Sequence, residues 1–328
     1  MPISQIGYVI DPALYCPHAF LPFMQSRITS VGLLVKPDPA DHFTYPDHID
    51  RGSLDALPPK PGIYIFRDEQ ERPLYIGKSV NIRARVLSHL RTPEEARMLQ
   101  ASRHVEFRRT AGEIGALLLE SRLIKEMQPL HNKKLRRTRE MCTLRLAPDV
   151  NAMPEIVYAR DHDFAVTADL YGLFATRKAA LERLRMIVES ERLCPAMCGL
   201  ESAVRGRACF ARQIARCLGA CIGEEPIEDH YLRLRAALEE MRVVVWPYPG
   251  PMGIVEECDG WRQTHVIDRW FYLGSVDHVK GAPPVRQPAR RTFDVDTYKI
   301  LVRPMMRGEL HIEPLEPVTL RGRKPGRA

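Results

Sequence analysis

The sequence predicts an α/β protein: a small α/β layer domain, then a cysteine-rich α+β module, then a β-rich C-terminal region. Three observations support this prediction. Residues 57–128 alternate between strand-like runs and runs with helical spacing of apolar residues. Five of the eight cysteines fall within 28 residues, and strand-like segments rich in Trp and Tyr follow Val243. A chain of 328 residues is long enough for two or three such domains.

The composition is that of an ordinary globular protein. Hydrophobic residues make up 45% and charged residues 27%, values that exclude disordered and collagen-like classes. We expect no membrane span, because no run of 18 apolar residues occurs. The first basic residue is Arg27, so the charged start of a secretory signal is missing. These features predict a cytoplasmic protein.

The net charge of +7 is concentrated in one segment. Between Lys78 and Arg139 there are 15 Lys and Arg against 6 Asp and Glu, whereas residues 1–60 hold 4 basic and 6 acidic side chains. A contiguous basic segment attracts a phosphate backbone, because each neutralised phosphate releases condensed counterions. An ordinary solvated basic face is the alternative, and charge alone does not separate the two.

The sequence divides into five parts. Residues 1–56 mix short apolar runs with Pro and Asp, and we expect a loosely folded extension there. The layer domain is expected at residues 57–140 and the cysteine-rich module at residues 141–225. A helix with a β-rich region of unassigned role should occupy residues 226–320, and a mobile basic tail residues 321–328.

Periodicity predicts the elements of these parts in order. The layer domain should begin with a β-hairpin, because two β-rich runs flank a wholly polar loop. The pattern then predicts strands and helices alternately, and further helices with single apolar stripes. The expected elements are strands Gly62–Phe66 and Pro73–Gly77, a helix capped by Ser79 that runs to about Leu90, strand Val105–Arg109, helix Gly112–Gln128 ended by Pro129, strand Ile156–Ala159, and helices Lys178–Glu191 and Glu228–Arg242. The aromatic residues Trp246, Trp261, Trp270 and Phe271 are expected to be core rather than a base-stacking surface.

Polar side chains gather around the predicted hairpin. Tyr64 and Tyr75 lie on adjacent strands and can meet across one face, with Lys78 and Arg85 close behind. Packing alone would explain two tyrosines but not the basic residues beside them. Glu120 shares the apolar face of its predicted helix with Leu117 and Ile124. A carboxylate there is costly unless an arginine pairs with it or a metal binds it.

These residues and their spacing resemble the GIY-YIG nuclease family. Gly62-Ile63-Tyr64 and Tyr75-Ile76-Gly77 match the two motifs that name the family, and Lys78 continues the second. Arg85, Glu120 and Asn132 match its helix arginine, metal-binding glutamate and following asparagine. Further phrases resemble the UvrC family, and the chain length is similar to that of its shorter members, which hold a single nuclease domain. These phrases are Tyr75–Ser79, Ala116–Glu120, Tyr171–Phe174 and Arg216–Cys221.

The resemblance implies a metal-dependent endonuclease that incises damaged double-stranded DNA 3′ to a lesion in nucleotide excision repair, on a complex with UvrB. A GIY-YIG restriction or mobile-element endonuclease and a non-catalytic DNA-binding module are the alternatives. The resemblance also implies a role for each residue. Glu120 would hold Mg²⁺ or Mn²⁺, and Arg85 would neutralise charge on the phosphate. Tyr75 would take a proton from the attacking water, with help from the Lys78 ammonium. Tyr64 would order this network, and Asn132 would position a neighbouring group.

Two further features of the nuclease segment bear on DNA. His89 stands where UvrC proteins carry a tyrosine, and it could donate to a phosphate oxygen or shuttle a proton. A basic run follows Asn132 and should contact phosphates rather than bases. Its residues are Lys133, Lys134, Arg136 and Arg137.

The clustered cysteines predict a metal centre. Cys194, Cys209, Cys217 and Cys221 are spaced C-x14-C-x7-C-x3-C. Zinc sites usually use tight C-x2–4-C pairs, whereas irregular spacing suits a [4Fe–4S] cluster, so we rank iron–sulfur above zinc and zinc above free thiols. The UvrC resemblance points the same way. Cys198 is an alternative to Cys194 as the first ligand, and the resemblance favours Cys194.

Overall fold

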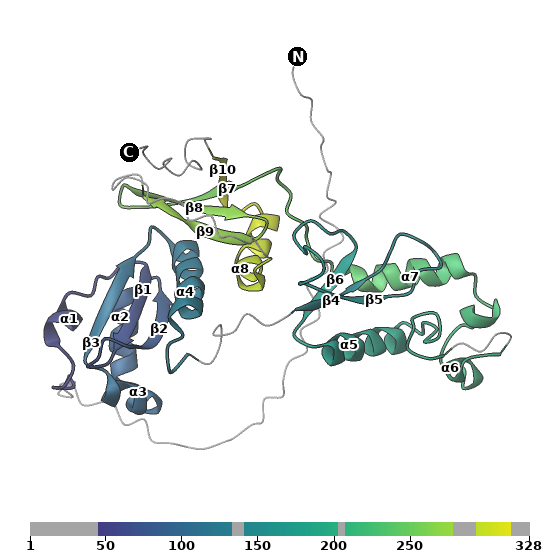
Figure 1. Cartoon of the computed structure of the whole chain (residues 1–328), viewed down its shortest axis with the longest axis horizontal. Helices are drawn as coiled ribbons and strands as arrows, with labels where there is room; N and C mark the ends of the chain where they lie inside the picture. Colours follow the sequence, from purple (N-terminus) through teal and green to yellow (C-terminus); the bar gives the residue numbers. More distant parts are fainter. Residues whose placement is uncertain (1–44, 133–140, 203–206, 278–292, 316–328) are drawn as a thin grey trace, which may run out of the picture. The chain divides into compact units, whose positions relative to one another are not determined.

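A computed structural model describes residues 45–132, 141–202, 207–277 and 293–315. It contains three antiparallel sheets, one in each successive part of the chain (Figure 1). This architecture confirms the predicted α/β class, with a layer domain, a cysteine-rich module and a β-rich C-terminal region. Among the helices of these residues, none is long and apolar enough to cross a membrane.

The layer domain is a three-stranded sheet flanked by helices. Its strands pair antiparallel in the order β2-β1-β3, which leaves β2 at one edge. The predicted hairpin, third strand and two helices are confirmed. The elements are α1 (Arg51–Asp55), β1 (Gly62–Arg67), β2 (Pro73–Ser79), α2 (Ile82–Leu90), η2 (Pro93–Glu95), α3 (Ala96–Ala101), β3 (His104–Arg109) and α4 (Glu113–Met127).

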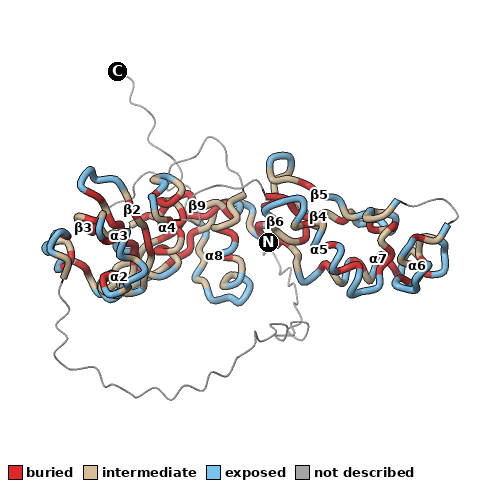
Figure 2. The backbone as a smooth tube through the Cα atoms, turned by 90° about the horizontal axis from the view of Figure 1, so that it is seen from below, coloured by how far each residue is buried: buried red, intermediate tan, exposed pale blue. Residues whose placement is uncertain are grey.

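The two faces of the sheet are covered by different helices. Ile63, Ile65 and Ile76 pack against Leu123 and Ile124 of α4. Because strand residues alternate between faces, Tyr64 and Tyr75 belong to the opposite face, where α2 lies. Figure 2 shows the exposed outer turns of α2 and α3 and the buried stretches of α4.

The predicted helix cap at Ser79 is wrong. Ser79 is the last residue of β2, and its hydroxyl accepts from the Asn81 N–H at 3.0 Å. Asn81 is the cap of α2, because its Oδ1 accepts from the Ala84 N–H at 3.0 Å. Both residues are good caps, and periodicity alone could not choose between them.

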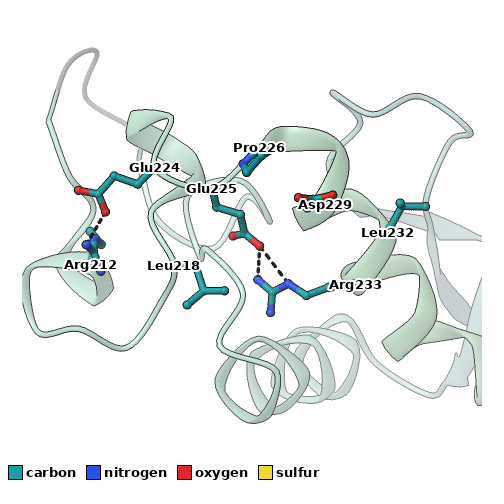
Figure 3. A pocket seen from close by; sticks show the side chains of 8 residues that line it. All are labelled: Arg212, Leu218, Glu224, Glu225, Pro226, Asp229, Leu232 and Arg233. Atoms are coloured by element: carbon teal, nitrogen blue, oxygen red, sulfur yellow. Dashed lines mark hydrogen bonds and ion pairs between the residues drawn. The ribbon is translucent and has the colours of Figure 1, made fainter.

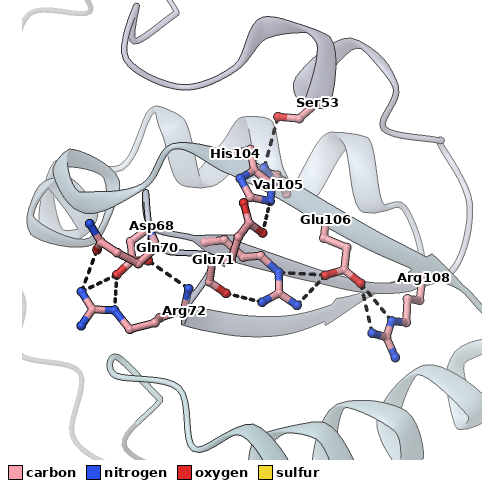
Figure 4. Close-up of polar contacts among 10 residues, drawn as sticks. Ser53, Asp68, Gln70, Glu71, Arg72, His104, Val105, Glu106 and Arg108 are labelled. Carbon is pink, nitrogen blue, oxygen red and sulfur yellow. Dashed lines mark hydrogen bonds and ion pairs between the residues drawn. The ribbon is translucent and has the colours of Figure 1, made fainter.

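The polar loop between β1 and β2 is a tight, hydrogen-bonded turn (Figure 4). The Asp68 carboxylate accepts from the N–H groups of Gln70 and Arg72, both at 2.9 Å, and from the Arg72 guanidinium. Arg67 at the end of β1 pairs with Glu106 of β3 at 2.6 Å. These contacts fix the hairpin that carries both tyrosines.

The expectation of a loose extension over residues 1–56 is wrong for residues 50–55, which belong to the layer domain. Asp50 caps α1 by accepting from the Ser53 N–H at 2.8 Å. The Asp50 N–H donates to the Arg103 carbonyl at 2.6 Å, and the Ser53 hydroxyl accepts from the Val105 N–H at 3.1 Å. Leu54 is buried against this surface. Residues 1–44 lie outside the described part of the chain.

The cysteine-rich module combines a small sheet with two long helices. Its strands pair in the order β5-β4-β6, and the apolar stripe of the predicted helix, Ala180, Leu184 and Ile187, is buried against them. Strands β4 and β6 were not predicted. The elements are β4 (Cys142–Arg145), β5 (Glu155–Tyr158), β6 (Leu170–Phe174), α5 (Arg177–Ser190), α6 (Phe210–Gln213), η3 (Ala220–Ile222) and α7 (Ile227–Glu239).

Helix α7 packs within this module rather than with the C-terminal region, so the expected boundary at residue 225 is wrong. Tyr231, Leu234 and Leu238 of α7 share one core with Leu184 and Ile187 of α5. The three residues lie three or four apart and form one face. The apolar Leu232 faces away and is exposed.

The C-terminal region is a four-stranded sheet with a helix. Its strands pair in the order β10-β7-β8-β9. Trp246 and Trp270 are buried in its core, as predicted. Helix α8 contradicts the expectation of β-structure there, because Tyr298 and Leu301 pack into the same core from one helical face. The elements are β7 (Met252–Cys258), β8 (Trp261–Asp268), β9 (Phe271–Asp277), α8 (Val295–Met306) and β10 (His311–Pro314).

Candidate active site and metal centre

Tyr64 and Tyr75 meet on the α2 face of the sheet. Their ring centroids are 6.3 Å apart, and Tyr64 is almost completely buried. Burial raises the pKa of both hydroxyls above the ordinary value, and the nearby charge of Glu120 raises both further. The close packing explains the glycine of the second motif, since a Cβ at Gly77 would lie 2.3 Å from the Tyr64 hydroxyl.

Helix α2 brings Arg85 and His89 to the tyrosines, because residues four apart share one helical face. Arg85 is exposed, and its hydrogen bond to Tyr64 raises the pKa of the guanidinium. His89 is buried, and its Nε2 lies 2.6 Å from the Tyr64 hydroxyl. The Nδ1 of the same ring contacts the carboxylate of Glu95 on η2. Glu95 was not predicted as a site residue, because it follows a turn that residue spacing does not reveal.

Glu120 lies at the edge of the sheet, half buried on α4. Its Oε1 accepts from the backbone N–H of Lys78 at 3.1 Å. Burial raises the pKa of Glu120 to about 7, although Lys78 opposes the rise. A divalent cation would offset the cost of this charge. Mg²⁺ typically uses one or two carboxylates and keeps several waters, so a single glutamate fits such a site.

Lys78 does not support Tyr75 in the expected way. Its Nζ pairs with Glu113 in the first turn of α4. Tyr75 and Lys78 are three residues apart in one strand, so their side chains belong to opposite faces of the sheet. Lys78 instead contributes its backbone N–H to Glu120.

Asn132 extends the sheet beyond its edge strand. Its Oδ1 accepts from the Ile76 N–H and its Nδ2 donates to the Ile76 carbonyl, both at 2.9 Å. The side chain therefore pairs with β2 as a neighbouring strand would, between Tyr75 and Gly77. The basic run that follows, with Lys133, Lys134, Arg136 and Arg137, lies outside the described residues.

The C-terminal region caps the helix that carries Glu120. The Glu256 carboxylate accepts from the N–H groups of Ile114 at 2.9 Å and Gly115 at 2.7 Å. Buried His265 holds Glu256 in place, with Nε2 and Oε2 2.9 Å apart. Gly112, at the cap position, has no side chain to serve this purpose. Local sequence patterns do not predict this contact, because it joins residues far apart in the chain.

The four predicted cysteine ligands lie together. The Cys209 sulfur is 3.7 Å from that of Cys194 and 3.6 Å from that of Cys217. The sulfurs of Cys194, Cys209 and Cys221 lie within 4.8 Å of one another. Cys198 instead packs into the apolar core of the module, where burial raises its pKa to about 12.

These thiols fit a metal centre, because a cation offsets the charge of clustered thiolates. Thiolates around one tetrahedral zinc lie about 3.8 Å apart, as follows from a Zn–S bond of about 2.3 Å. The sulfur distances match that spacing. Ligands of a [4Fe–4S] cluster each bind a different iron and lie further apart.

Two ion pairs support the cysteine loops, and one of them reaches α7 (Figure 3). Arg212 pairs with Glu224, and Arg233 pairs with buried Glu225 at 2.6 Å. Buried His230 accepts from the Cys194 N–H at 3.0 Å and so fixes the first ligand. Arg212 also donates to the Cys217 carbonyl at 3.4 Å, so this arginine supports the cysteine loop itself.

Comparisons with known proteins agree with this division of the chain. Three domain families match in succession: the UvrC-like GIY-YIG domain at residues 60–133, the UvrC/Cho excinuclease middle domain at residues 141–240, and the excinuclease Cho C-terminal domain at residues 251–319. Excinuclease Cho of Escherichia coli (strain K12) is 49% identical over 296 residues, which are 90% of this chain and 98% of that protein. The chain belongs to the excinuclease Cho family.

Other relatives extend this result. Excinuclease Cho of Salmonella typhi is 50% identical over 82% of this chain and 91% of its own length. UvrABC system protein C of Cereibacter sphaeroides is 33% identical over 55% of this chain and 29% of its own length. The magnesium-bound GIY-YIG N-terminal endonuclease domain of UvrC from Thermotoga maritima covers 25% of this chain and 93% of its own, at 32% identity and a TM-score of 0.24. Membership of the Cho family confirms the predicted UvrC resemblance and makes the chain a DNA-cleaving hydrolase.

Proposed function

We propose that this Cho-family protein incises damaged double-stranded DNA on the 3′ side of a lesion in nucleotide excision repair, acting on a UvrB–DNA complex. The observation that carries the proposal is the convergence of Tyr64, Tyr75, Arg85 and Glu120 from β1, β2, α2 and α4. Tyr64 is hydrogen-bonded to Tyr75 and to Arg85. The charge of Glu120 acts on both tyrosines. The group combines a proton acceptor, a cation and a metal-binding carboxylate, which phosphodiester hydrolysis requires.

Each side chain has one task in this reaction. Tyr75 takes the proton from the attacking water, Tyr64 holds Tyr75, and Arg85 neutralises charge that grows on the phosphate. Asn132 keeps the edge strand beside Tyr75 in place. Glu120 would hold Mg²⁺ or Mn²⁺, and this ion, when bound, supplies Lewis-acid stabilisation of the phosphate and the leaving 3′-oxygen.

The alternatives predict different substrates. A restriction or mobile-element endonuclease would cut undamaged DNA at a fixed sequence, and a binding module would not cut at all. The middle and C-terminal domains match excinuclease families, which favours the repair function over a restriction or mobile-element endonuclease. The complete set of nuclease side chains favours catalysis over binding alone.

The decisive measurement is incision of an end-labelled duplex with one bulky lesion, compared with the same duplex without it, with and without UvrB and Mg²⁺. We expect a single cut 3′ to the lesion that requires UvrB. Glu120→Gln should lower the rate on the order of 10²- to 10³-fold, with unchanged DNA binding, because the amide keeps the shape but not the charge. Glu126→Gln, on the exposed side of the same helix, is the matched control. Normal cutting by Glu120→Gln would remove Glu120 from the metal site, and cutting of undamaged DNA at one sequence would contradict the repair function.

The basic run after Asn132 should bind the phosphate backbone. Replacing Lys133, Lys134, Arg136 and Arg137 with Ala should weaken binding to every duplex and reduce the slope of log affinity against log salt by about 3 to 4. Fluorescence anisotropy over a salt series measures this slope. An unchanged slope would assign the run to an ordinary solvated face.

We propose a [4Fe–4S] cluster as the occupant of the cysteine centre, held by Cys194, Cys209, Cys217 and Cys221. The irregular spacing of the four ligands along the chain supports it, and the sulfurs would have to move apart from their present separations to bind four different irons. Zinc is the second candidate, because the sulfur separations of 3.6 and 3.7 Å suit one tetrahedral ion.

A further inference from the structure

His89 sits in a closed set of polar contacts drawn from three elements. Its Nε2 lies 2.6 Å from the Tyr64 hydroxyl of β1, and its Nδ1 contacts the Glu95 carboxylate of η2. Only 2% of the His89 side chain is exposed, whereas Glu95 is one-third exposed. The ring centroid of His89 is 5.3 Å from that of Tyr64 and 5.5 Å from that of Tyr75.

The Glu95 contact determines where the protons lie. A carboxylate can only accept, so the Nδ1 of His89 must carry a proton. Burial lowers the pKa of His89 despite the opposing effect of Glu95, so the ring is neutral and its Nε2 is unprotonated. The hydrogen bond between Tyr64 and Nε2 therefore runs from the phenol to the imidazole.

We propose that Glu95 is a positioning residue of the nuclease: it fixes His89 as the proton acceptor for Tyr64, so that Glu95, His89 and Tyr64 together deprotonate Tyr75. The inference rests on the roles of Tyr64 and Tyr75 proposed above. It assigns a function to a residue that lies outside the hairpin, α2 and α4.

Two coupled proton transfers form the Tyr75 phenolate. The Tyr75 hydroxyl proton passes to the Tyr64 oxygen as the Tyr64 proton passes to Nε2 of His89. The products are a Tyr75 phenolate, a neutral Tyr64 and a His89 imidazolium beside the Glu95 carboxylate. The phenolate then accepts a proton from the attacking water, whose oxygen bonds to phosphorus as the bond to the 3′-oxygen breaks. The 3′-oxygen leaves with the bonding electron pair and takes up a proton from solvent. The surplus proton on His89 is lost to solvent before the next turnover.

The site needs such help because the surroundings of the two tyrosines, taken together, oppose a phenolate. Burial raises the pKa of Tyr64 and Tyr75, and Glu120 adds to the rise in both. The charge of Glu95 itself raises the pKa of Tyr75, so Glu95 can assist only through His89. Arg85 lowers the pKa of both tyrosines, but the pKa of each stays above its ordinary value. Lys78, the cation expected to assist, pairs with Glu113 on the other face of the sheet. A carboxylate behind an imidazole makes the ring a better acceptor, since it stabilises the imidazolium that forms.

A merely structural contact is the alternative, in which Glu95 ties η2 to α2 and affects only stability. Two variants distinguish this structural contact from the proposed positioning role. Glu95→Gln removes the charge and keeps the size, and Glu94→Gln changes the exposed neighbouring carboxylate as the control. Each is compared with the unchanged protein in single-turnover cleavage across acidic to alkaline pH, with melting temperature measured in parallel.

We expect Glu95→Gln to lower the single-turnover rate about 10²-fold, the lower range of general-base assistance. Glu94→Gln should cleave normally. The acidic limb of the pH–rate profile should move to lower pH in Glu95→Gln, because Glu95 raises the pKa of His89 and its loss removes that effect. The groups that face His89 are Tyr64 from β1, Tyr75 from β2, Arg85 from α2 and Glu95 from η2. Of these groups, only Glu95 differs between the unchanged protein and Glu95→Gln.

A second readout does not depend on cleavage. Nitrogen-15 NMR of His89 in the metal-free protein should show a proton on Nδ1 and none on Nε2, and Glu95→Gln should lower the pKa of the ring, because the charge of Glu95 raises it. A Glu95→Gln protein with normal rate, normal pH profile and an unchanged pKa of His89 would overturn the inference, as would a lower melting temperature as the sole change. Failure of the unchanged protein to cut would count against the proposed function, and the NMR titration would still test Glu95.

Discussion

Several ionisable residues of the nuclease site are buried, and burial disfavours their charged forms. Tyr64, Tyr75 and Glu120 all have a raised pKa because of burial, and the pKa of His89 is lowered for the same reason. Each group is thus biased toward its neutral form before substrate arrives. A metal ion and a phosphate would bring the charges that reverse this bias, so catalysis is coupled to binding.

Glu120 makes this coupling measurable through pH. Its pKa of about 7 lies above the ordinary value, so the carboxyl is protonated at lower pH and cannot bind metal. We predict that the affinity of the metal-free protein for Mg²⁺ falls about tenfold per pH unit below pH 7 and levels off above it. Isothermal titration calorimetry at several pH values measures this. An affinity independent of pH below 7 would contradict the prediction, and Glu120→Gln, which should bind weakly at every pH, is the control.

The sequence predicted those site residues that local patterns determine. Tyr64 and Tyr75 stand in motifs on paired strands, and Arg85 and Glu120 keep fixed helical spacings from their neighbours. Glu95 could not be predicted, because the turn between α2 and η2 brings it back to His89. The expected help of Lys78 to Tyr75 was wrong for a related reason: closeness in sequence hid the alternation of strand faces.

At the scale of elements, α4 links catalysis to the C-terminal region. The helix carries Glu120, and its first turn is capped by Glu256 of β7. Burial raises the pKa of Glu256, but hydrogen bonds from His265 and the Gly115 N–H outweigh it and leave the pKa below its ordinary value. The carboxylate therefore stabilises the fold above its ordinary pKa of 4.5, and this contribution is lost as pH falls through the lowered pKa.

We predict that Glu256→Gln lowers the free energy of unfolding by about 1 to 2 kcal/mol, the usual worth of a helix cap with a favourable charge. Cleavage should weaken as well, since the start of α4 also orients Glu120. Chemical denaturation and the incision assay measure the two effects. The exposed Glu257→Gln is the matched control, and equal stability of the two variants would show that the cap contributes nothing.

Among the elements, periodicity succeeded where one chain segment makes its own pattern and failed where tertiary contacts decide. The hairpin, α2, α4 and α5 were predicted because their apolar residues recur at regular spacing. Helix α8 was not, since Pro304 near its end and the β-rich surroundings masked the stripe of Tyr298 and Leu301. Strands β4 and β6 are only four and five residues long and pair across a distant segment.

Across the whole molecule, the three parts differ in what holds them together. The nuclease and C-terminal sheets have aliphatic and aromatic cores. The loops around the cysteines are packed around Cys194, Cys209, Cys217 and alanines instead, while Phe210 and Ile214 point outward and are exposed. Such a segment has little apolar area to stabilise it, so a metal centre would take the place of a core.

The metal content of the purified protein tests this centre. Protein purified without oxygen should be brown and contain about four irons per chain. Ser at Cys194, Cys209, Cys217 or Cys221 should abolish the colour and expose residues 194–225 to limited proteolysis while the nuclease domain stays intact.

Cys198→Ser is the internal control, because Cys198 lies in the apolar core of the module rather than among the four ligands. It should keep the metal and lose only about 1 to 3 kcal/mol, the cost of burying an unpaired hydroxyl. If Cys198→Ser lost the metal and Cys194→Ser kept it, Cys198 would be the first ligand in place of Cys194. A colourless anaerobic preparation with one zinc per chain would overturn the iron–sulfur assignment. The four thiolates would then be a zinc site, because the sulfur separations of 3.6 and 3.7 Å suit a single tetrahedral ion.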